Sequence, residues 1–486
     1  MQLYSPESVY QLDRAAVSED RLSEIELMQR AGEYVWRSIC ERWPRLGVIT
    51  VFAGAGNNGG DAFVVALDAL RQGVNVQLLV QGDLDRQSPT SKHFRLLYEQ
   101  AGGKYEHWNQ QAFQGELIVD GLLGIGLQRD LDASWQALVT AINSSALACV
   151  AIDIPSGLNG RTGVAQPIAV EASLTITFIG RKTGQFLADG PDYCGELLFA
   201  DLGVSRRVRA SQPAALETIE SCRLPRPRKR NSHKNHYGNL LIVGGDRGMS
   251  GAVTLAARAA LRSGAGLVTA LVHPDCRGDL AAFPEIMTLG WEALDAKLEN
   301  ATVVVVGPGL GESGAARECL ERLETASQAM VIDASALKQQ FLHDLATSTK
   351  VITPHPGEAA RLLSSTTRAV QGDRIEACRQ LIDSFAATTV LKGSGTLIGD
   401  DETGPLAINT CGNPGMASAG MGDVLSGIIA AFLGQGLAPF EAARSAVHLH
   451  ARCADAWSRN RDQCGLMAGD IIDLIPEVMC SLREEQ

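Results

Sequence analysis

The chain has 486 residues, of which 45% are hydrophobic and 20% are charged, and its net charge is −12. This length exceeds one ordinary core and predicts two domains of roughly two hundred residues or more each. The acidic balance argues against a nucleic-acid partner, because phosphate backbones attract the opposite charge. The 11 cysteines include no C-x-x-C pair, which favours free core thiols over disulfides or structural zinc.

Nothing in the hydropathy pattern indicates a membrane protein. No apolar run reaches the roughly twenty residues of a membrane span. The N-terminal stretch MQLYSPESVY lacks the basic and then apolar order of a leader. We therefore expect a cytoplasmic protein without a membrane partner.

His448 and His450 lie two residues apart on a predicted helix, which favours core or surface roles over metal binding.

The first half of the chain alternates predicted strands and helices. An amphipathic helix is predicted over residues 18–43. Strands are predicted at residues 48–52, 74–80, 117–120 and 148–152. Helices are predicted from the end of the loop at residues 54–61 to about Leu70, and at residues 90–100 and 133–142. Such alternation predicts a mostly parallel sheet with helices on both faces, in a Rossmann-like three-layer α/β domain that we place at residues 1–220.

Polar residues follow these strands at the sheet edge where α/β proteins bind ligands. The loop GAGNNGGD at residues 54–61 contains Asn57, Asp120 ends the third strand, and Asp153 and Ser156 follow the fourth. Oxygen atoms of Asn57, Asp120 and Ser156 form a candidate potassium site, with turn and cap residues as the alternative. Asp153 is a candidate acid–base residue, with a strand-end cap as the alternative.

A standard NAD-dependent dehydrogenase is disfavoured by the same region. The glycine loop departs from the usual Rossmann spacing, and no acidic residue ends the second strand.

The motifs LMQRAG at residues 27–32, GAGNNGGD at 54–61, DGLLGIG at 120–126 and IDIPSGLNG at 152–160 resemble the NAD(P)H-hydrate epimerase family. The resemblance implies potassium ligands at Asn57, Asp120 and Ser156, and an acid–base residue at Asp153. It also implies substrate contacts at Gly56, Asn57, Asn58, Gly59, Gly60, Gly124, Ile125, Gly126, Leu127, Gln128, Arg129, Asp130 and Asp153. Ala62 departs from the family pattern, in which a glycine is expected.

A basic run with two prolines, at residues 221–238, predicts an exposed linker. Beyond it, strands are predicted at residues 239–243, 267–272, 302–306, 330–333, 350–353 and 389–392, and a helix begins near Ser250. This second alternation predicts another three-layer α/β domain at residues 239–486.

The stretch NPGMASAGMGDVLSGIIAAF at residues 413–432 joins a glycine loop to an apolar helix. Gly422 and Asp423 fall at the start of that helix, where free N–H groups and the helix dipole bind anions. A carboxylate beside such a site can take the proton of a hydroxyl that attacks a phosphoryl group. A glycine loop that Asp423 merely caps is the alternative.

Further motifs in this half are GGD at residues 244–246, GPGLG at 307–311, TPHPGE at 353–358 and KGSGT at 392–396. Together they resemble the ribokinase-like family, and more closely its ADP- or ATP-dependent NAD(P)H-hydrate dehydratases. The resemblance implies Asp423 as the base. It implies substrate contacts at Ala252, Gly309, Gly311, His355 and Asp423, and nucleotide contacts at Lys392, Gly393, Ser394, Gly395, Thr396 and Gly422.

These resemblances imply a bifunctional repair enzyme for NAD(P)HX, the hydrated form of NAD(P)H. It would interconvert the R and S epimers with potassium. It would dehydrate the S epimer through a phosphorylated intermediate, with ADP as the phosphoryl donor and magnesium as a cofactor. ATP is the alternative donor. We expect a homo-oligomer. Two other hypotheses are a ribokinase-like small-molecule kinase with a non-catalytic N-terminal domain, and a binding module.

Overall fold

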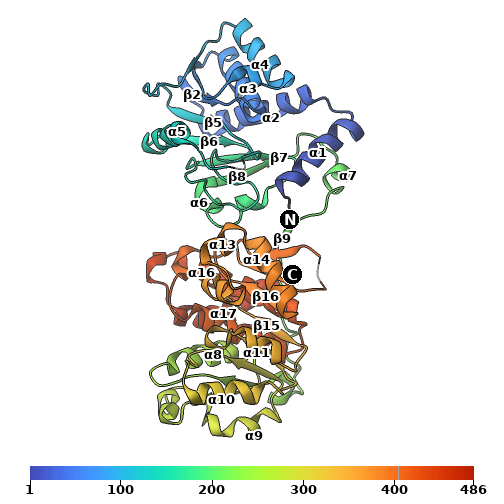
Figure 1. Ribbon diagram of the computed structural model, residues 1–486, viewed down its shortest axis with the longest axis vertical. Helices are drawn as coiled ribbons and strands as arrows, with labels where there is room; N and C mark the ends of the chain where they lie inside the picture. The colour runs from blue at the N-terminus through green and yellow to red at the C-terminus, as the bar shows by residue number, and fades with distance from the viewer. Residues whose placement is uncertain (128, 403, 486) are drawn as a thin grey trace. The chain divides into compact units, whose positions relative to one another are not determined.

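The structure is a computed structural model that describes residues 1–127, 129–402 and 404–485. The chain divides into two compact units, one formed by Gln2–Leu216 and the other by Glu217–Gln486 together with Met1. In Figure 1 the first unit is coloured blue to green and the second green to red. None of the described helices is long and apolar enough to cross a membrane.

The first unit contains a parallel sheet with the strand order β4-β3-β2-β5-β6-β7-β8. In that order the strands are β4 (Tyr105–His107), β3 (Asn75–Val80), β2 (Val48–Ala53), β5 (Leu117–Gly121), β6 (Ala148–Ile152), β7 (Leu174–Phe178) and β8 (Glu196–Ala200). All four predicted strands are present, with bounds shifted by one residue at most.

Helices cover both faces of this sheet. Val51 of β2 packs in a core with α2 (Glu24–Arg42), α3 (Asn57–Arg71) and α4 (Pro89–Gln100). The next residue, Phe52, points to the other face, where it packs in a core with α5 (Ala133–Ser144). This alternation of side chains confirms the predicted three-layer α/β architecture. The other elements of the unit are β1 (Gln2–Leu3), α6 (Gly190–Cys194) and α7 (Arg206–Arg209), and the chain passes from the first unit to the second within β9 (Leu216–Thr218).

The N-terminal segment differs from the prediction of one helix over residues 18–43. The structure has two helices, α1 (Pro6–Glu19) and α2, separated by Arg21 in the left-handed conformation with φ 58°. Ser23 and Glu26 form a reciprocal capping box that begins α2. Helix α1 was not predicted, although Ser5 caps its N-terminus and Val9 lies on its buried face.

The second unit contains a mixed sheet in which β18-β17-β16-β15-β14-β13-β10-β11-β12 follow one another. These strands are β18 (Leu406–Ile408), β17 (Leu397–Gly399), β16 (Thr388–Leu391), β15 (Lys350–Ile352), β14 (Ala329–Ile332), β13 (Val303–Val306), β10 (Asn239–Val243), β11 (Leu267–Val272) and β12 (Met287–Gly290). The strands from β16 to β12 are parallel, whereas β17 and β18 are antiparallel to their neighbours.

One face of this sheet packs in a large core with four helices, α8 (Ser250–Arg262), α15 (Met421–Gly434), α16 (Pro439–Ser458) and α17 (Ala468–Glu484). Helix α15 is the predicted apolar helix, and Gly427 allows its close approach to α8. A Cβ at Gly427 would lie 2.2 Å from the Ala256 carbonyl oxygen. The shorter helices are α9 (Leu294–Leu298), α10 (Gly314–Leu323), α11 (Gln339–Asp344), α12 (Pro356–Leu362), α13 (Thr367–Gly372) and α14 (Arg374–Phe385).

The basic run at residues 221–238 is only partly exposed. Cys222 and Leu224 are buried in the core of the second unit. The run from Arg226 to His236 is largely exposed and contains a 3-10 turn at Lys234–Tyr237. Apolar side chains in the early part of this segment therefore attach it to the second unit.

Candidate active sites

A cavity of about 940 Å³ opens in the first unit at the carboxyl edge of its sheet. It is lined by the glycine loop, by helix α1 and by the loops that follow β5, β6 and β7. Of the predicted site residues, those that line it are Gly56, Asn57, Asn58, Gly124, Ile125, Gly126, Leu127, Arg129, Asp130 and Asp153. Gln128, also predicted, lies outside the described residues.

Gly59 and Gly60 have a packing role in the glycine loop and do not line the cavity. A Cβ at Gly59 would lie 1.9 Å from the Gly54 carbonyl oxygen, and one at Gly60 would lie 2.5 Å from the Met28 sulfur. Gly56, at the start of α3, has open space where a Cβ would be. Within this loop, Gly56 is therefore the glycine whose backbone a ligand can approach.

Asp120 and Ser156 contact each other, and neither is among the residues that line the cavity. The Asp120 carboxylate is fully buried and accepts hydrogen bonds from the Ser156 hydroxyl at 2.6 Å and the Ser156 N–H at 2.8 Å. Burial raises the pKa of Asp120 to about 6, against the lowering effect of the hydrogen bonds from Ser156 and Leu122. The Ser156 oxygen also accepts a hydrogen bond from the Leu123 N–H at 2.9 Å.

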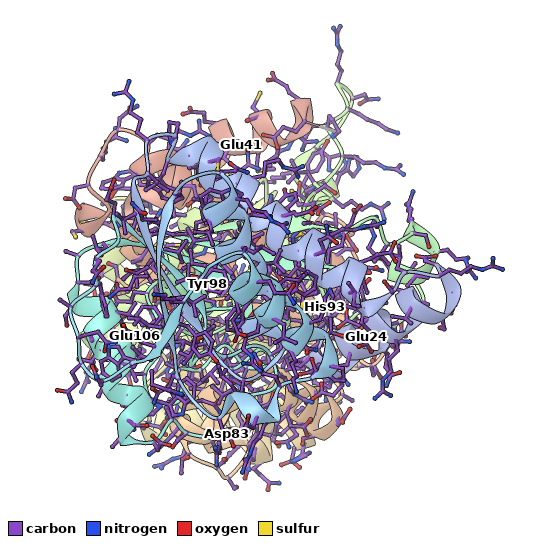
Figure 2. All side chains as sticks on the ribbon, turned by 90° about the horizontal axis from the view of Figure 1, so that it is seen from above. Glu24, Glu41, Asp83, His93, Tyr98 and Glu106 are labelled. Atoms are coloured by element: carbon purple, nitrogen blue, oxygen red, sulfur yellow. The ribbon has the colours of Figure 1, made fainter. Side chains whose placement is uncertain are left out.

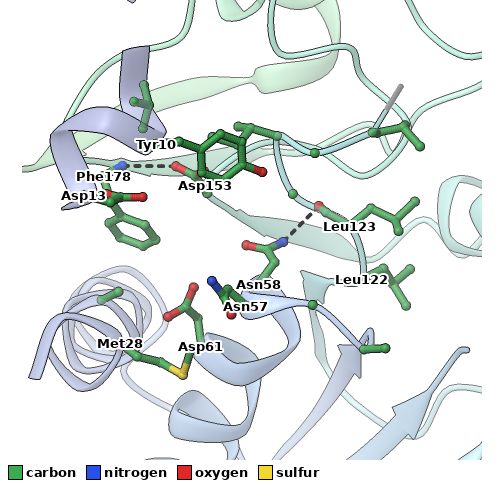
Figure 3. A pocket seen from close by; sticks show the side chains of 18 of the residues that line it. Tyr10, Asp13, Met28, Asn57, Asn58, Asp61, Leu122, Leu123, Asp153 and Phe178 are labelled. Atoms are coloured by element: carbon green, nitrogen blue, oxygen red, sulfur yellow. Dashed lines mark hydrogen bonds between the residues drawn. The ribbon is translucent and has the colours of Figure 1, made fainter. Parts of the chain in front are cut away.

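The two asparagines of the glycine loop have different surroundings. Asn58 is 6% exposed and its amide donates a hydrogen bond to the Leu123 carbonyl at 3.0 Å. Figure 3 shows the amide oxygen of Asn58 on the side away from Leu123, toward the cavity. Asn57 is exposed and its amide oxygen accepts a hydrogen bond from Ser88 at 3.0 Å. Asn58 thus shares the Leu122–Leu123 segment with Asp120 and Ser156, whereas Asn57 contacts a different loop.

Asp153 follows β6 in the left-handed backbone conformation, with φ 63°. Such a conformation is strained for a non-glycine residue and is often found at active sites. Its carboxylate accepts hydrogen bonds from the Thr177 hydroxyl at 3.1 Å and the Phe178 N–H at 3.2 Å. It also forms an ion pair with Lys182, whose side chain is fully buried. We did not predict Lys182 from the sequence, although the run RKTG contains it.

Two more carboxyl groups line the same cavity and were also not predicted. Asp61 ends the NNGGD motif and is 9% exposed, and Asp13 comes from α1. Burial raises the pKa of Asp13 to about 6, with Lys182 lowering it and Asp153 raising it further. Burial also raises the pKa of Asp61, and Asp153 and Asp13 add to this effect. These interactions place the three carboxyl groups and Lys182 close together.

A side-chain hydrogen bond links two helices at this cavity. Glu24, at the start of α2 and labelled in Figure 2, accepts a hydrogen bond at 3.1 Å from Thr90 near the start of α4. Both residues line the cavity.

The second candidate site lies at the carboxyl edge of the sheet in the second unit. Gly309 and Gly311 follow β13 with φ 59° and 71°, which favours glycine. A Cβ at Gly309 would lie 2.3 Å from the Met249 carbonyl oxygen and 3.2 Å from the Ala252 side chain. The structure therefore brings Gly309 and Ala252 together, as expected for two contacts of one substrate.

Lys392 and Asp333 form the buried centre of this site. The Lys392 ammonium lies 2.9 Å from one Asp333 oxygen, and the Ser426 hydroxyl donates to the other at 2.9 Å. Burial raises the pKa of Asp333, but Lys392 and hydrogen bonds from Thr353 and Ser426 outweigh it and leave this pKa below its usual value. Asp333, which ends the predicted strand at residues 330–333, was not predicted as a site residue.

Asp423 lies in the first turn of α15, as predicted. Burial, with the nearby charges of Asp333 and Glu358, raises the pKa of Asp423 to about 7, although Lys392 opposes the shift. A Cβ at Gly422 would lie 3.2 Å from the Lys392 nitrogen. The helix N-terminus, the ammonium group and a carboxyl group able to change protonation near neutral pH therefore meet here.

The KGSGT loop connects the antiparallel strands β16 and β17. Gly393 and Gly395 have φ 132° and 64°. Arg374, which is 1% exposed, donates hydrogen bonds to the carbonyls of Leu391 and Lys392, each at 3.1 Å. Ser394 and Thr396 complete the predicted loop. Arg374 was not predicted, yet it fixes the backbone at Lys392.

His355 caps helix α12. Its Nδ1 accepts hydrogen bonds from the N–H groups of Gly357 at 3.0 Å and Glu358 at 3.4 Å. The Glu358 carboxylate accepts a hydrogen bond from the His355 N–H at 2.7 Å and lies 3.8 Å from the Lys392 nitrogen. Glu358 thus connects His355 to Lys392, so that the TPHPGE and KGSGT motifs belong to one site.

The fold and the two sites define a fusion of two α/β enzyme domains. Residues 24–184 match the family model described as YjeF-related protein N-terminus, and residues 240–477 match that of NAD(P)H-hydrate dehydratase. The chain is 39% identical to the bifunctional NAD(P)H-hydrate repair enzyme Nnr of Coxiella burnetii, across 96% of this chain and 97% of that protein.

The corresponding enzyme of Escherichia coli is 37% identical, across 96% of this chain and 92% of that protein. A solved structure of ADP/ATP-dependent NAD(P)H-hydrate dehydratase from Bacillus subtilis, co-crystallised with ATP/Mg2+, is 30% identical. It matches 53% of this chain and 94% of its own, with a TM-score of 0.49. The chain belongs to the family of bifunctional NAD(P)H-hydrate repair enzymes.

Proposed function

We propose that the two sites divide one repair reaction between them. The first site interconverts the R and S epimers of NAD(P)HX, and the second dehydrates the S epimer to NAD(P)H with ADP, or ATP, as the phosphoryl donor. The observation that carries the second assignment is the position of Asp423 in the second site. It lies at a helix N-terminus near Lys392, and its pKa of about 7 suits a general base.

In the second site, Asp423 takes the proton of the C6 hydroxyl as its oxygen attacks the terminal phosphorus. Backbone N–H groups at Gly420 and Gly422, with the Lys392 ammonium, stabilise the negative charge that develops. As the new P–O bond forms, the bond from the terminal phosphorus to the rest of the nucleotide breaks. The ring nitrogen then supplies electrons, the C6–O bond breaks and phosphate leaves. Loss of a proton from C5 to water gives the C5–C6 double bond of NAD(P)H. Substrate binds against Ala252, Gly309, Gly311 and His355, and the nucleotide phosphates bind at Lys392, Gly393, Ser394, Gly395, Thr396 and Gly422.

Magnesium fits this site only together with the nucleotide. Among the described residues, no group of three or more His, Cys, Asp or Glu side chains could hold a metal ion. Magnesium commonly takes one or two carboxylates and completes its coordination with phosphate oxygens and water. It would neutralise phosphate charge, and Glu358 and Asp423 are the carboxylates we propose to face it.

In the first site, potassium would be held by oxygen atoms of Asp120, Ser156 and Asn58, and it would supply positive charge beside the substrate. An all-oxygen set suits a hard cation. The hydrogen bond from Asn58 to Leu123, next to the Ser156 contact, supports Asn58 as the third ligand in place of Asn57. The cavity-lining residues of the loops at 56–58 and 124–130 would bind the substrate.

The test uses each purified epimer of NADHX with potassium, magnesium and ADP or ATP, and follows the return of dihydronicotinamide absorbance. We expect complete recovery from both epimers, with the R epimer limited by epimerisation. A stable phosphorylated product without absorbance would instead support a small-molecule kinase. No reaction with either nucleotide would overturn the proposal.

A further inference from the structure

Epimerisation at the first site needs a proton donor for the C6 hydroxyl. Loss of the C6 hydroxyl as water requires a proton on its oxygen. The Asp153 carboxylate accepts hydrogen bonds from Thr177 and Phe178 and forms the ion pair with Lys182. Two hydrogen bonds and one ion pair therefore hold this carboxylate in place beside the cavity. Asp153 is positioned to stabilise positive charge on the ring.

Asp13 and Asp61 have different surroundings. Both line the cavity, and among the described residues no hydrogen bond contributes to the pKa of either carboxyl group. Figure 3 shows Asp13, Asp61 and Asp153 on the same side of the cavity. Burial favours the neutral, protonated form, and for Asp13 it raises the pKa to about 6.

Asp13 is the more accessible of these two carboxyl groups. Asp13 lies three residues after Tyr10, and both line the cavity from the same face of α1. Asp61 lies on α3 and is more deeply buried, at 9% exposure. The charged or titratable groups that line the cavity are Tyr10, Asp13, Arg14, Glu24, Asp61, Arg129, Asp130, Asp132, Asp153 and Lys182.

We propose that Asp13, on the helix α1 that precedes the matched family region, is the proton donor for the C6 hydroxyl of the hydrate. This inference rests on the proposed epimerase function. The ring nitrogen lone pair forms a C=N bond as the C6–O bond breaks, and Asp13 gives its proton to the departing oxygen. Water then adds to C6 from the opposite face, the C=N electrons return to nitrogen, and the water proton returns to Asp13. Asp153 stabilises the cationic ring between the two steps.

The experiment measures conversion of the purified R epimer to the S epimer without nucleotide, so that dehydration does not occur. Asp13→Asn keeps the shape of the side chain but removes its acidic proton. We expect the rate to fall about 100-fold or more. Asp13→Glu should retain activity within about tenfold of wild type. The matched control is Glu7→Gln, which removes an exposed carboxylate from the same helix outside the cavity and should leave the rate unchanged.

A pH profile separates proton donation from a structural role. Because Asp13 must be protonated to act, kcat/KM of the wild-type enzyme should fall as the pH rises above about 6. Asp13→Asn should abolish this dependence, and dehydration of the S epimer should be unchanged in every variant. A wild-type rate in Asp13→Asn, or an unchanged alkaline limb, overturns the inference. A wild-type enzyme that does not epimerise at all overturns the proposed epimerase function instead.

Discussion

The two sites use a buried lysine–aspartate pair in different ways. In the first unit Lys182 pairs with Asp153, the residue predicted to carry the chemistry. In the second unit Lys392 pairs with Asp333, and the predicted base Asp423 keeps a raised pKa of about 7. In the second unit Lys392 holds the pKa of Asp333 below its usual value, against the effect of burial. The difference shows that burial raises the pKa of the carboxyl groups that lack a lysine partner, to about 7 at Asp423 and to about 6 at Asp13.

The largest expected effect comes from Asp423→Asn. Loss of the general base should reduce dehydration of the S epimer about 10²–10⁴-fold, because proton transfer commonly contributes that much to a rate. Epimerisation of the R epimer should be unchanged, and both rates can be measured on one protein sample. Equal loss of both activities would contradict the separation of the two sites.

The two lysines allow a matched comparison of stability. Lys392→Met leaves Asp333 buried without its counter-ion, and breaking such a pair costs about 3–5 kcal/mol. Lys182→Met should destabilise the first unit less, because the Asp153 side chain is 15% exposed and can be hydrated, against 3% for Asp333. Denaturant unfolding of each variant measures the difference, and an equal loss would contradict this expectation.

The pKa of Asp423 predicts the pH dependence of dehydration. The base must be ionised, so kcat/KM should fall as the pH drops below about 7. In the folded state Asp423 binds its proton more tightly than in the unfolded state, so its ionisation lowers the free energy of unfolding as the pH rises from about 4 to about 7. Asp423→Asn should therefore stabilise the protein by ~1–2 kcal/mol at pH 8 and have little effect near pH 3. Greater stabilisation at the acidic end would contradict the assigned shift.

Gly422→Ala should have the smallest effect. The added methyl group would lie 3.2 Å from the Lys392 nitrogen, at the end of a flexible side chain. Alanine also favours the helix by about 1 kcal/mol relative to glycine. We expect near-wild-type unfolding and a rise of about tenfold in KM for the nucleotide, since a shift of about 1.4 kcal/mol corresponds to tenfold in binding. An unchanged KM would argue against phosphate binding at Gly422.

Local patterns predicted the parts of the molecule that are continuous in sequence. Alternating apolar segments predicted the parallel strands of both sheets, and the glycine-rich motifs predicted the loops at their carboxyl edges. The same patterns predicted the positions of Asp153 and Asp423, because each directly follows a recognisable strand or begins a recognisable helix.

Pairings between distant residues could not be predicted in this way. Lys182 reaches Asp153 across 29 residues, and Lys392 reaches Asp333 across 59. Asp13 enters the cavity through the packing of α1, whose charged sequence gave a weak apolar pattern. Whether Asn57 or Asn58 would hold potassium depends on side-chain direction, which the motif NNGGD does not specify.

A mixing experiment tests most directly whether two independent sites complete one repair. The Asp153→Asn and Asp423→Asn variants are each assayed alone and then together, with the purified R epimer and ADP, at equal total protein. Neither variant alone should convert the R epimer to NADH faster than spontaneous epimerisation allows. Because the S epimer can diffuse from one protein to the other, the mixture should restore rapid and complete conversion. A mixture no faster than the Asp153→Asn variant alone would contradict the account.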